Sequence, residues 1–333
     1  MKALVYTDVE ELTYKDCPQP SAGENESLIQ IMASGICGSD MHAFLGHDER
    51  RPSPLILGHE ASGVIVEGVD KGKRVTINPL VSCGVCRDCK AGRTNLCAYR
   101  QIISMPPREG AFAQFVSMPR ENLIEVPGDV AFEKAALCEP IACGWHAVRL
   151  GTKVLDGKPQ DQQCLVIGGG AIGVGAAVSL SAFGYEDITL FEPNPVRREK
   201  LQELSNFKTV EPSSNDGEMA NSFDLVIDGV GFAGTRATAC AMVRQGGVIC
   251  HIGLGDAKEG LDVRRMTLQE ITFIGTYTYT TEDFRETAEA IFDGRLGSLE
   301  WFETRPLDEG QSAFEDIRAG RTVSPKTILL PQQ

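Results

Sequence analysis

The chain is short of positive charge. Its 333 residues include 32 lysines and arginines against 46 aspartates and glutamates, which gives a formal net charge of -14. An acidic surface repels nucleic-acid phosphates and anionic lipids, so neither nucleic acid nor membrane is expected as a partner. The sequence also lacks an apolar run of bilayer length, and Lys2 and Asp8 place charge too early for a signal peptide. We therefore expect a cytoplasmic protein.

Cysteine is a scarce residue, yet four of the 11 cysteines form one C-x2-C-x2-C-x7-C run: Cys83, Cys86, Cys89 and Cys97. Four thiolates at such spacing can surround one zinc ion tetrahedrally. The alternative is a disulfide pair or four buried thiols. It is disfavoured because two-residue loops strain a disulfide and because glycines and charged residues flank the run. Since four thiolates leave no open coordination position, we expect a structural zinc in a lobe at about residues 80–100.

The pattern of expected strands and helices changes near residue 148, and the length of 333 residues also favours two domains. The first 140 residues are expected to be mainly β, with strands at 28–33, 61–66 and 111–116. The second part alternates between a helix over 171–183 and strands at 163–167, 188–191, 223–227 and 247–252. Such alternation predicts a parallel sheet covered by helices, and hence an α/β protein.

A glycine-rich turn follows the strand at 163–167 and matches G-x-G-x-x-G. The residues expected to contact a dinucleotide are Gly168, Gly170, Ala171, Ile172 and Gly173. Glu192, at the end of the next strand, is expected to accept hydrogen bonds from the adenosine ribose, although it could simply be a turn residue before Pro193. A carboxylate here repels a 2′-phosphate, whereas Arg197 offers a phosphate partner. We predict NAD as the cofactor.

A second set of metal-ligating residue types is spread over the N-terminal part. Cys37 and His59 are too far apart for a finger-like knuckle, so they can share a metal only if the fold brings them together. Glu60 follows His59, and Glu139 lies between an alanine-rich stretch and an apolar turn. Burying a carboxylate there is costly unless something pairs with it, and a metal ion would do so.

These motifs together resemble the zinc-dependent medium-chain alcohol and polyol dehydrogenases over nearly the whole chain. The shared motifs are Gly-x-Cys-Gly-Ser-Asp at 35–40, Gly-His-Glu at 58–60, the four cysteines, Glu-Pro at 139–140 and the glycine-rich turn. The Glu-Pro form is more similar to the sorbitol and threonine dehydrogenases. The resemblance implies a β-rich GroES-like catalytic domain over 1–147 and 278–333, and a doubly wound Rossmann domain over 148–277. It also implies a homodimer or homotetramer.

The resemblance further implies a mechanism with two zinc ions per chain. The catalytic zinc, held by Cys37, His59 and a carboxylate, stabilises the alkoxide of a bound secondary alcohol. Hydride passes to NAD and leaves a ketone, while the proton leaves through Ser39, the cofactor ribose and His42. Asp40 is expected to fix the His59 ring. Ser39 could alternatively cap the helix that begins near Asp40.

The sequence leaves open which carboxylate binds the catalytic zinc. Both Glu60 and Glu139 bound together with a thiolate would make the site anionic, so we expect one of them on the metal and the other through water or by alternation. The substrate is expected to be a polyol, a sugar acid or a hydroxy amino acid. Sorbitol dehydrogenases carry an arginine where this chain has Thr278, which argues against a plain sorbitol-type substrate.

Two other classes remain as alternatives. A zinc-independent NAD(P)H quinone or enoyl reductase would share the Rossmann domain but not the set of Cys37, His59 and Glu139. A non-enzymatic zinc-ribbon binding protein would share the four cysteines but would need a basic face, which the net charge of -14 disfavours.

Overall fold

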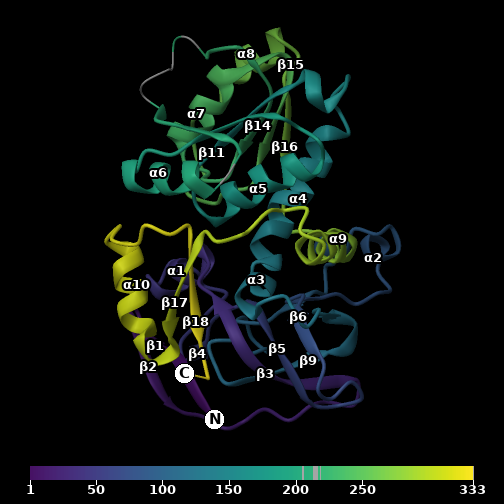
Figure 1. Cartoon of the computed structure of the whole chain (residues 1–333), viewed down its shortest axis with the longest axis vertical. Coiled ribbons are helices and arrows are strands. Elements are labelled where there is room, and N and C mark those ends of the chain that lie inside the picture. Colours follow the sequence, from purple (N-terminus) through teal and green to yellow (C-terminus); the bar gives the residue numbers. More distant parts are fainter. Residues whose placement is uncertain (205, 213–216, 218, 333) are drawn as a thin grey trace. The chain divides into compact units, whose positions relative to one another are not determined.

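The computed structural model describes residues 1–204, 206–212, 217 and 219–332, and the chain divides into two compact units (Figure 1). The β unit comprises Met1–Glu139, Thr280–Asp293 and Phe302–Gln333. The α/β unit comprises Pro140–Tyr279 and Gly294–Trp301. The first crossing between them falls within helix α4 (Cys138–Thr152). The α/β unit is therefore an insertion into the chain that builds the β unit.

The α/β unit contains one parallel six-stranded sheet in the order β13-β12-β11-β14-β15-β16. This is the strand order of a doubly wound dinucleotide-binding sheet, so the predicted fold class is confirmed. Its strands are β11 (Gln163–Ile167), β12 (Asp187–Phe191), β13 (Lys208–Val210), β14 (Phe223–Asp228), β15 (Val243–His251) and β16 (Thr272–Gly275).

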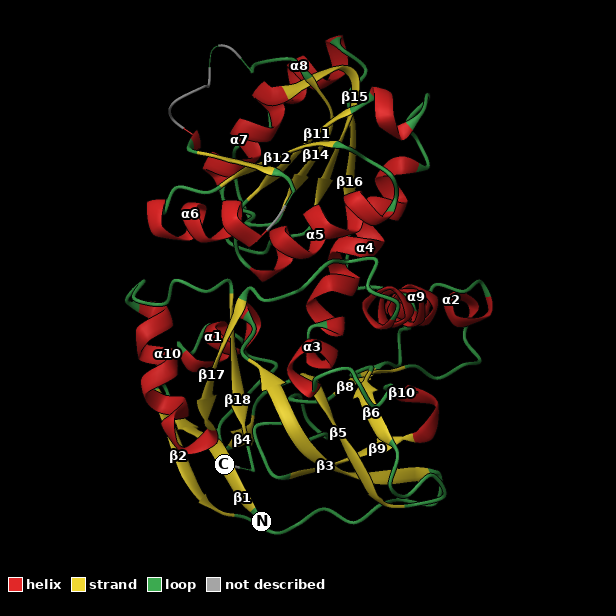
Figure 2. Cartoon of the chain, viewed as in Figure 1, coloured by secondary structure: helices red, strands yellow, loops and turns green. Residues whose placement is uncertain are grey.

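Helices pack around this sheet (Figure 2), and an apolar core lies between the two layers. The helices after α4 are α5 (Ala171–Ala182), α6 (Pro195–Leu204), α7 (Ala233–Met242) and α8 (Val263–Leu268). Strands β11 and β14 are almost wholly buried because helices cover both faces of a parallel sheet. The four predicted strands and the helix are all present, and β15 is longer than predicted at its N-terminal end.

The β unit is built on three sheets. The first has three strands in the order β2-β1-β4. The second and largest has the order β10-β6-β5-β3-β18-β17, and β9 also pairs with β3. The third consists of β7 and β8. The strands are β1 (Lys2–Asp8), β2 (Glu11–Asp16), β3 (Glu26–Gly35), β4 (Leu55–Ile56), β5 (Glu60–Glu67), β6 (Arg74–Ile77), β7 (Leu80–Val81), β8 (Gln101–Ile102), β9 (Phe115–Pro119), β10 (Leu123–Glu125), β17 (Phe302–Pro306) and β18 (Lys326–Leu330).

The C-terminal strand β18 lies beside β3 from the start of the chain, as the yellow and purple ribbons in Figure 1 show. Ile328 is opposite Gly35 across this antiparallel pair, and Gly35 is in turn opposite Glu60 of β5. Residues from three distant parts of the sequence therefore meet at one point of the sheet. The helices of this unit are α1 (Gly38–Phe44), α2 (Arg87–Lys90), α3 (Phe132–Ala136), α9 (Thr281–Phe292) and α10 (Gly310–Arg318).

The predicted strand at 111–116 is only partly correct, because β9 begins at Phe115. Ala111 and Phe112 bond instead to the backbone oxygens of Gly58 and Leu57, at 2.9 Å in both cases. The Phe112 ring is fully buried and packs edge-on against Phe314 with centroids 6.0 Å apart. Core packing therefore overrides the local strand preference.

Among the described residues, no helix is both long and apolar enough to cross a membrane.

Candidate active and metal sites

The four cysteines of the run come together in one lobe of the β unit. Their sulfur atoms all lie within 4.8 Å of one another, and the Sγ atoms of Cys83 and Cys89 are 4.0 Å apart. Ligands at about 2.3 Å from a tetrahedral zinc stand roughly 3.8 Å apart, so the cage has the size that zinc needs. A hydrogen bond between Thr94 and Thr281, 3.0 Å long, ties the lobe to the start of α9.

Backbone amides point at these sulfur atoms. The N–H of Cys86 donates to Sγ of Cys83 at 3.4 Å, and the N–H of Cys89 donates to Sγ of Cys86 at 3.5 Å. The amide of Cys89 is the main cause that lowers the pKa of Cys86 to about 6. Burial and the neighbouring sulfurs raise the pKa of Cys89 to about 12. A cation at the centre would let all four remain thiolates.

The fold also brings Cys37, His59 and Glu60 together. Cys37 precedes α1, His59 precedes β5 and Glu60 begins β5, and their ligand atoms lie within 4.8 Å of one another. His59 and Glu60 are buried, whereas Cys37 is half-buried. The combination of one thiolate, one imidazole and one carboxylate is a donor set for a zinc that keeps a fourth position open.

Asp40 holds the backbone and the ring around this group. Its side chain is fully buried and accepts hydrogen bonds from the N–H groups of Cys37 at 3.0 Å and Gly58 at 3.1 Å. Its Oδ1 also lies 3.4 Å from Nδ1 of His59, which leaves the Nε2 side of the ring free for a metal. Burial opposes a charged imidazole, but Asp40 and the Cys37 thiolate raise the pKa of His59 well above its usual value. The surroundings of His59 therefore favour the protonated, positively charged form of its imidazole ring.

The two glutamates occupy different positions. Glu60 is buried, and Nζ of Lys326 lies 2.7 Å from each of its two carboxylate oxygens. Glu139, at the start of α4, is buried as well but is not one of the three residues within 4.8 Å. It lies close enough to Lys326 to raise the pKa of that side chain. These residues fit a zinc ion, with Glu60 nearer to the other two ligands.

Ser39 and His42 lie one turn apart on α1, and therefore on the same face of the helix. The helix begins at Gly38 with Cys37 as its N-cap, so the alternative in which Ser39 caps it is wrong. Nη2 of Arg51 is 3.5 Å from the Ser39 hydroxyl.

The glycine-rich turn has the geometry that a pyrophosphate needs. Gly168 has a φ of 103°, and a side chain on it would contact Val230. The Cα of Gly170 faces open space at the N-terminus of α5. A Cβ on Gly173 would lie 1.8 Å from the carbonyl oxygen of Gly168, so helix and strand can approach only because it is glycine. Ala171 and Ile172 form the first turn of α5, where N–H groups are free for an anion.

Glu192 follows β12 and reaches back to this turn. Its carboxylate accepts hydrogen bonds from the N–H groups of Gly169 at 3.0 Å and Asn194 at 2.7 Å, and only 4% of the residue is exposed. Nη1 of Arg197 is 3.6 Å away. Glu192 is thus fixed beside the turn rather than free in solvent.

The chain matches two protein families: "Alcohol dehydrogenase GroES-like domain" over residues 23–128 and "Zinc-binding dehydrogenase" over residues 171–293. It is 32% identical to L-galactonate-5-dehydrogenase of Escherichia coli (strain K12) over 89% of this chain and 88% of that protein. The chain belongs to the zinc-dependent medium-chain dehydrogenase family. The dehydrogenase is also 32% identical to sorbitol dehydrogenase of Bacillus subtilis (strain 168), over 84% of its own length and 82% of that protein.

A crystal structure from Sinorhizobium meliloti 1021, described as a proposed zinc-binding dehydrogenase bound to NADP, shares the fold of the dehydrogenase. The TM-score is 0.89 at 27% identity, and the match covers 99% of both chains. The two-domain GroES-like and Rossmann architecture is therefore confirmed. This enzyme transfers hydride from a secondary alcohol to a nicotinamide dinucleotide, gives a ketone and depends on zinc.

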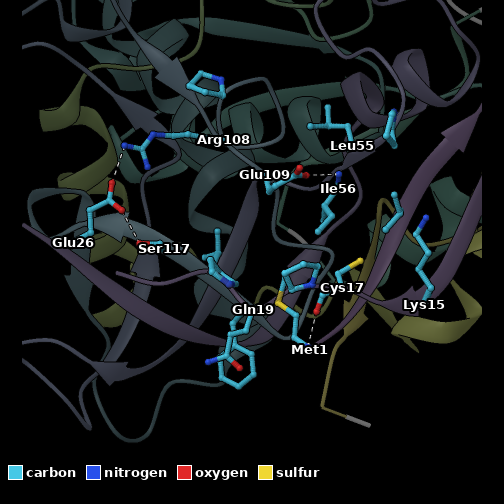
Figure 3. Close-up of a pocket in the computed structure, with 17 residues that line it drawn as sticks. Met1, Lys15, Cys17, Gln19, Glu26, Leu55, Ile56, Arg108, Glu109 and Ser117 are labelled. Carbon is cyan, nitrogen blue, oxygen red and sulfur yellow. Dashed lines mark hydrogen bonds and ion pairs between the residues drawn. The ribbon is translucent and has the colours of Figure 1, made fainter. Parts of the chain in front are cut away.

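The dehydrogenase has a further pocket of about 530 Å³ in its β unit, shown in Figure 3. Glu26 accepts hydrogen bonds there from Arg108 at 2.8 Å and Ser117 at 2.6 Å, and Glu109 accepts one from the N–H of Ile56 at 2.7 Å. The wall of this pocket includes none of the four residues expected at the catalytic zinc. It is therefore separate from the group of Cys37, His59 and Glu60.

Sequence reasoning missed two buried cations near the catalytic group of the dehydrogenase. Arg51 is 3% exposed, pairs with Asp48 at 2.5 Å and donates to the backbone oxygen of Ser104 at 3.1 Å. Lys326 is 4% exposed and pairs with Glu60. The only signal for Lys326 was a charge at the start of an otherwise apolar segment, and nothing in the sequence marked Arg51.

Proposed function

We propose that the catalytic centre of this dehydrogenase is the group of Cys37, His59 and Glu60, with Glu139 nearby, and that it oxidises a polyol, a sugar acid or a hydroxy amino acid. The observation that carries the proposal is the convergence of the first three side chains, whose ligand atoms all lie within 4.8 Å of one another. Zinc bound there would act as a Lewis acid for the substrate hydroxyl. The four cysteines would hold a second zinc that serves only stability.

The chain's own residues then have separate tasks. Asp40 fixes the His59 ring and the two backbone segments that carry the ligands. The Ser39 hydroxyl, half-buried and close to Arg51, would accept the substrate proton, and His42, one turn further along α1, would release it to solvent. A proton path of this kind lets the alcohol lose its proton without opening the site to bulk water.

Thr278 supports a substrate that differs from sorbitol. It has a φ of 47°, which is unusual for a β-branched residue, and its buried Oγ1 has no hydrogen-bond partner among the described residues. Strain and unsatisfied polar atoms are often found at functional positions. A hydroxyl in place of an arginine suits a neutral polar group of the substrate.

The test is a panel of polyols, sugar acids, secondary alcohols and hydroxy amino acids, with NADH absorbance as the readout and metal content measured on the same sample. We expect turnover of at least one sugar-derived alcohol and about two zinc ions per chain. About one zinc per chain would favour a zinc-independent reductase. Two zinc ions without turnover of any compound would contradict the proposal.

We infer that the preferred cofactor is NAD. Glu192 is held by two backbone amides and cannot easily turn away from a 2′-phosphate, although Arg197 reduces its negative field. We expect kcat/KM to be at least about tenfold higher with NAD than with NADP, and E192A to reduce or reverse that ratio. E186Q removes an exposed carboxylate of the same unit and should leave the ratio unchanged. A wild-type preference for NADP would contradict the inference.

We also propose that the enzyme works in the cytoplasm as a homodimer or homotetramer. None of the 11 cysteines forms a disulfide, as expected in a reducing compartment. Strand β16 is an edge strand of the parallel sheet, and the α/β unit exposes 72% of Leu254 and 70% of Leu268. An open edge near apolar side chains favours pairing with a second copy. Sedimentation velocity gives the mass, and a monomer would contradict the proposal.

A further inference from the structure

Lys326 is a buried cation that contacts a residue of the catalytic group. Its Nζ donates to Oε1 of Glu60 at 2.7 Å and to the backbone oxygen of Ile36 at 2.8 Å. The side chains of Lys326 and Glu60 are 3% and 1% exposed. Removing two charges from water is costly, and a pair this deeply buried needs close geometry to remain charged. Charge balance at the protein surface therefore does not explain why the Lys326–Glu60 pair is buried.

The sheet creates the contact by means of one glycine. Gly35 of β3 lies between β18 and β5, opposite Ile328 on one side and Glu60 on the other. A Cβ on Gly35 would stand 2.1 Å from Oε2 of Glu60. Because Gly35 has no side chain, the carboxylate can lie across β3 and reach the ammonium group.

Lys326 interacts with three anions of the catalytic group. Its Nζ contacts both carboxylate oxygens of Glu60 at 2.7 Å, and the Cys37 thiolate and Glu139 add their negative charges. A zinc ion brings two positive charges to these three negative ones, and neutral His59 adds none. One further positive charge makes the group neutral.

We propose that Lys326 is a positioning residue that neutralises Glu60 and holds its carboxylate, so that both glutamates can stand near the catalytic zinc without weakening its Lewis acidity. The proposal rests on the zinc site proposed above. Nζ of Lys326 lies 2.7 Å from both carboxylate oxygens of Glu60, so the ammonium group withdraws charge from whichever oxygen faces the metal. Without the ammonium group, Glu60 would bind the metal more strongly and compete with the substrate for the open position.

The test compares K326M, which keeps the length and removes the charge, with K326R, which keeps the charge. We expect K326M to lower kcat by about 10- to 100-fold with both zinc ions still bound, and K326R to recover part of the loss. The visible spectrum of the cobalt(II)-substituted enzyme should change in K326M, because it reports the ligands and their number. K73M removes an ion-paired lysine on the surface of the same unit and should match wild type.

The double variant E60Q/K326M separates this role from a simple loss of stability. If Lys326 acts through Glu60, the double variant should have the kcat and the cobalt spectrum of E60Q alone, so the two effects are not additive. It also removes both buried charges and should fold even if K326M does not. Additive effects, or a K326M enzyme with wild-type kcat and spectrum, would overturn the proposal. Failure of the proposed zinc site is distinct, because the wild-type enzyme would then bind only about one zinc.

Discussion

Replacing His59 with alanine is expected to lower kcat/KM for alcohol oxidation by at least about a thousandfold. A Lewis acid stabilises the transition state by several kcal/mol, and each ~1.4 kcal/mol changes the rate tenfold. His59 supplies one of three ligand atoms within 4.8 Å, and its ring is set by Asp40 at 3.4 Å. Alanine leaves only a thiolate and a carboxylate, so zinc content should fall from about two to about one per chain.

The matched control is H47A, because His47 is an exposed histidine of the same unit, just after helix α1. Its zinc content and kcat/KM should equal those of wild type. Circular dichroism and the melting temperature show whether H59A retains the fold. If H59A kept both zinc ions and its full rate, the assignment of the catalytic centre would be wrong.

Replacing Cys97 with serine is expected to remove the zinc of the lobe and most of its binding free energy, which is on the order of 10 kcal/mol. Cys97 is the fully buried member of the four, and its Sγ accepts a hydrogen bond from the N–H of Cys83 at 3.4 Å. Since a whole domain is stable by only about 5–15 kcal/mol, the lobe should unfold locally. Calorimetry should show a melting temperature lower by roughly 10 °C or more.

Limited proteolysis distinguishes local unfolding from loss of the whole fold. Cleavage of C97S is expected between residues 83 and 100, with the rest of the chain still resistant. C17S is the control, because Cys17 is a half-buried thiol outside the cage. A C97S protein that still binds two zinc ions and resists cleavage there would show that the four thiolates do not hold a metal.

Features encoded by residues close in the sequence could be predicted in full. The four cysteines and the glycine-rich turn each lie within one short segment, and the structure places both as the spacing requires. The pattern of strands and helices that gives the parallel sheet is equally local. The family resemblance predicted that Cys37 and His59 come together, but only the folded structure gives the distances between their ligand atoms.

Features that depend on distant partners could not be predicted. Lys326 lies 266 positions from Glu60, and nothing in either segment indicates that β18 pairs with β3. Ala111 and Phe112 have strand-forming neighbours, but their N–H groups donate to the backbone oxygens of Gly58 and Leu57, and β9 begins only at Phe115. In both cases the deciding contact is set by sheet topology.

The interior position of β18 also affects the order in which a growing chain can fold. Every strand of the α/β unit has been synthesised by residue 275, and its last segment, Gly294–Trp301, follows soon after. The β unit needs β17 and β18, and β18 ends only at Leu330. Domains tend to fold as units during synthesis. The inserted unit can therefore fold before β17 and β18 are synthesised, whereas the β unit cannot be completed until β18 has left the ribosome.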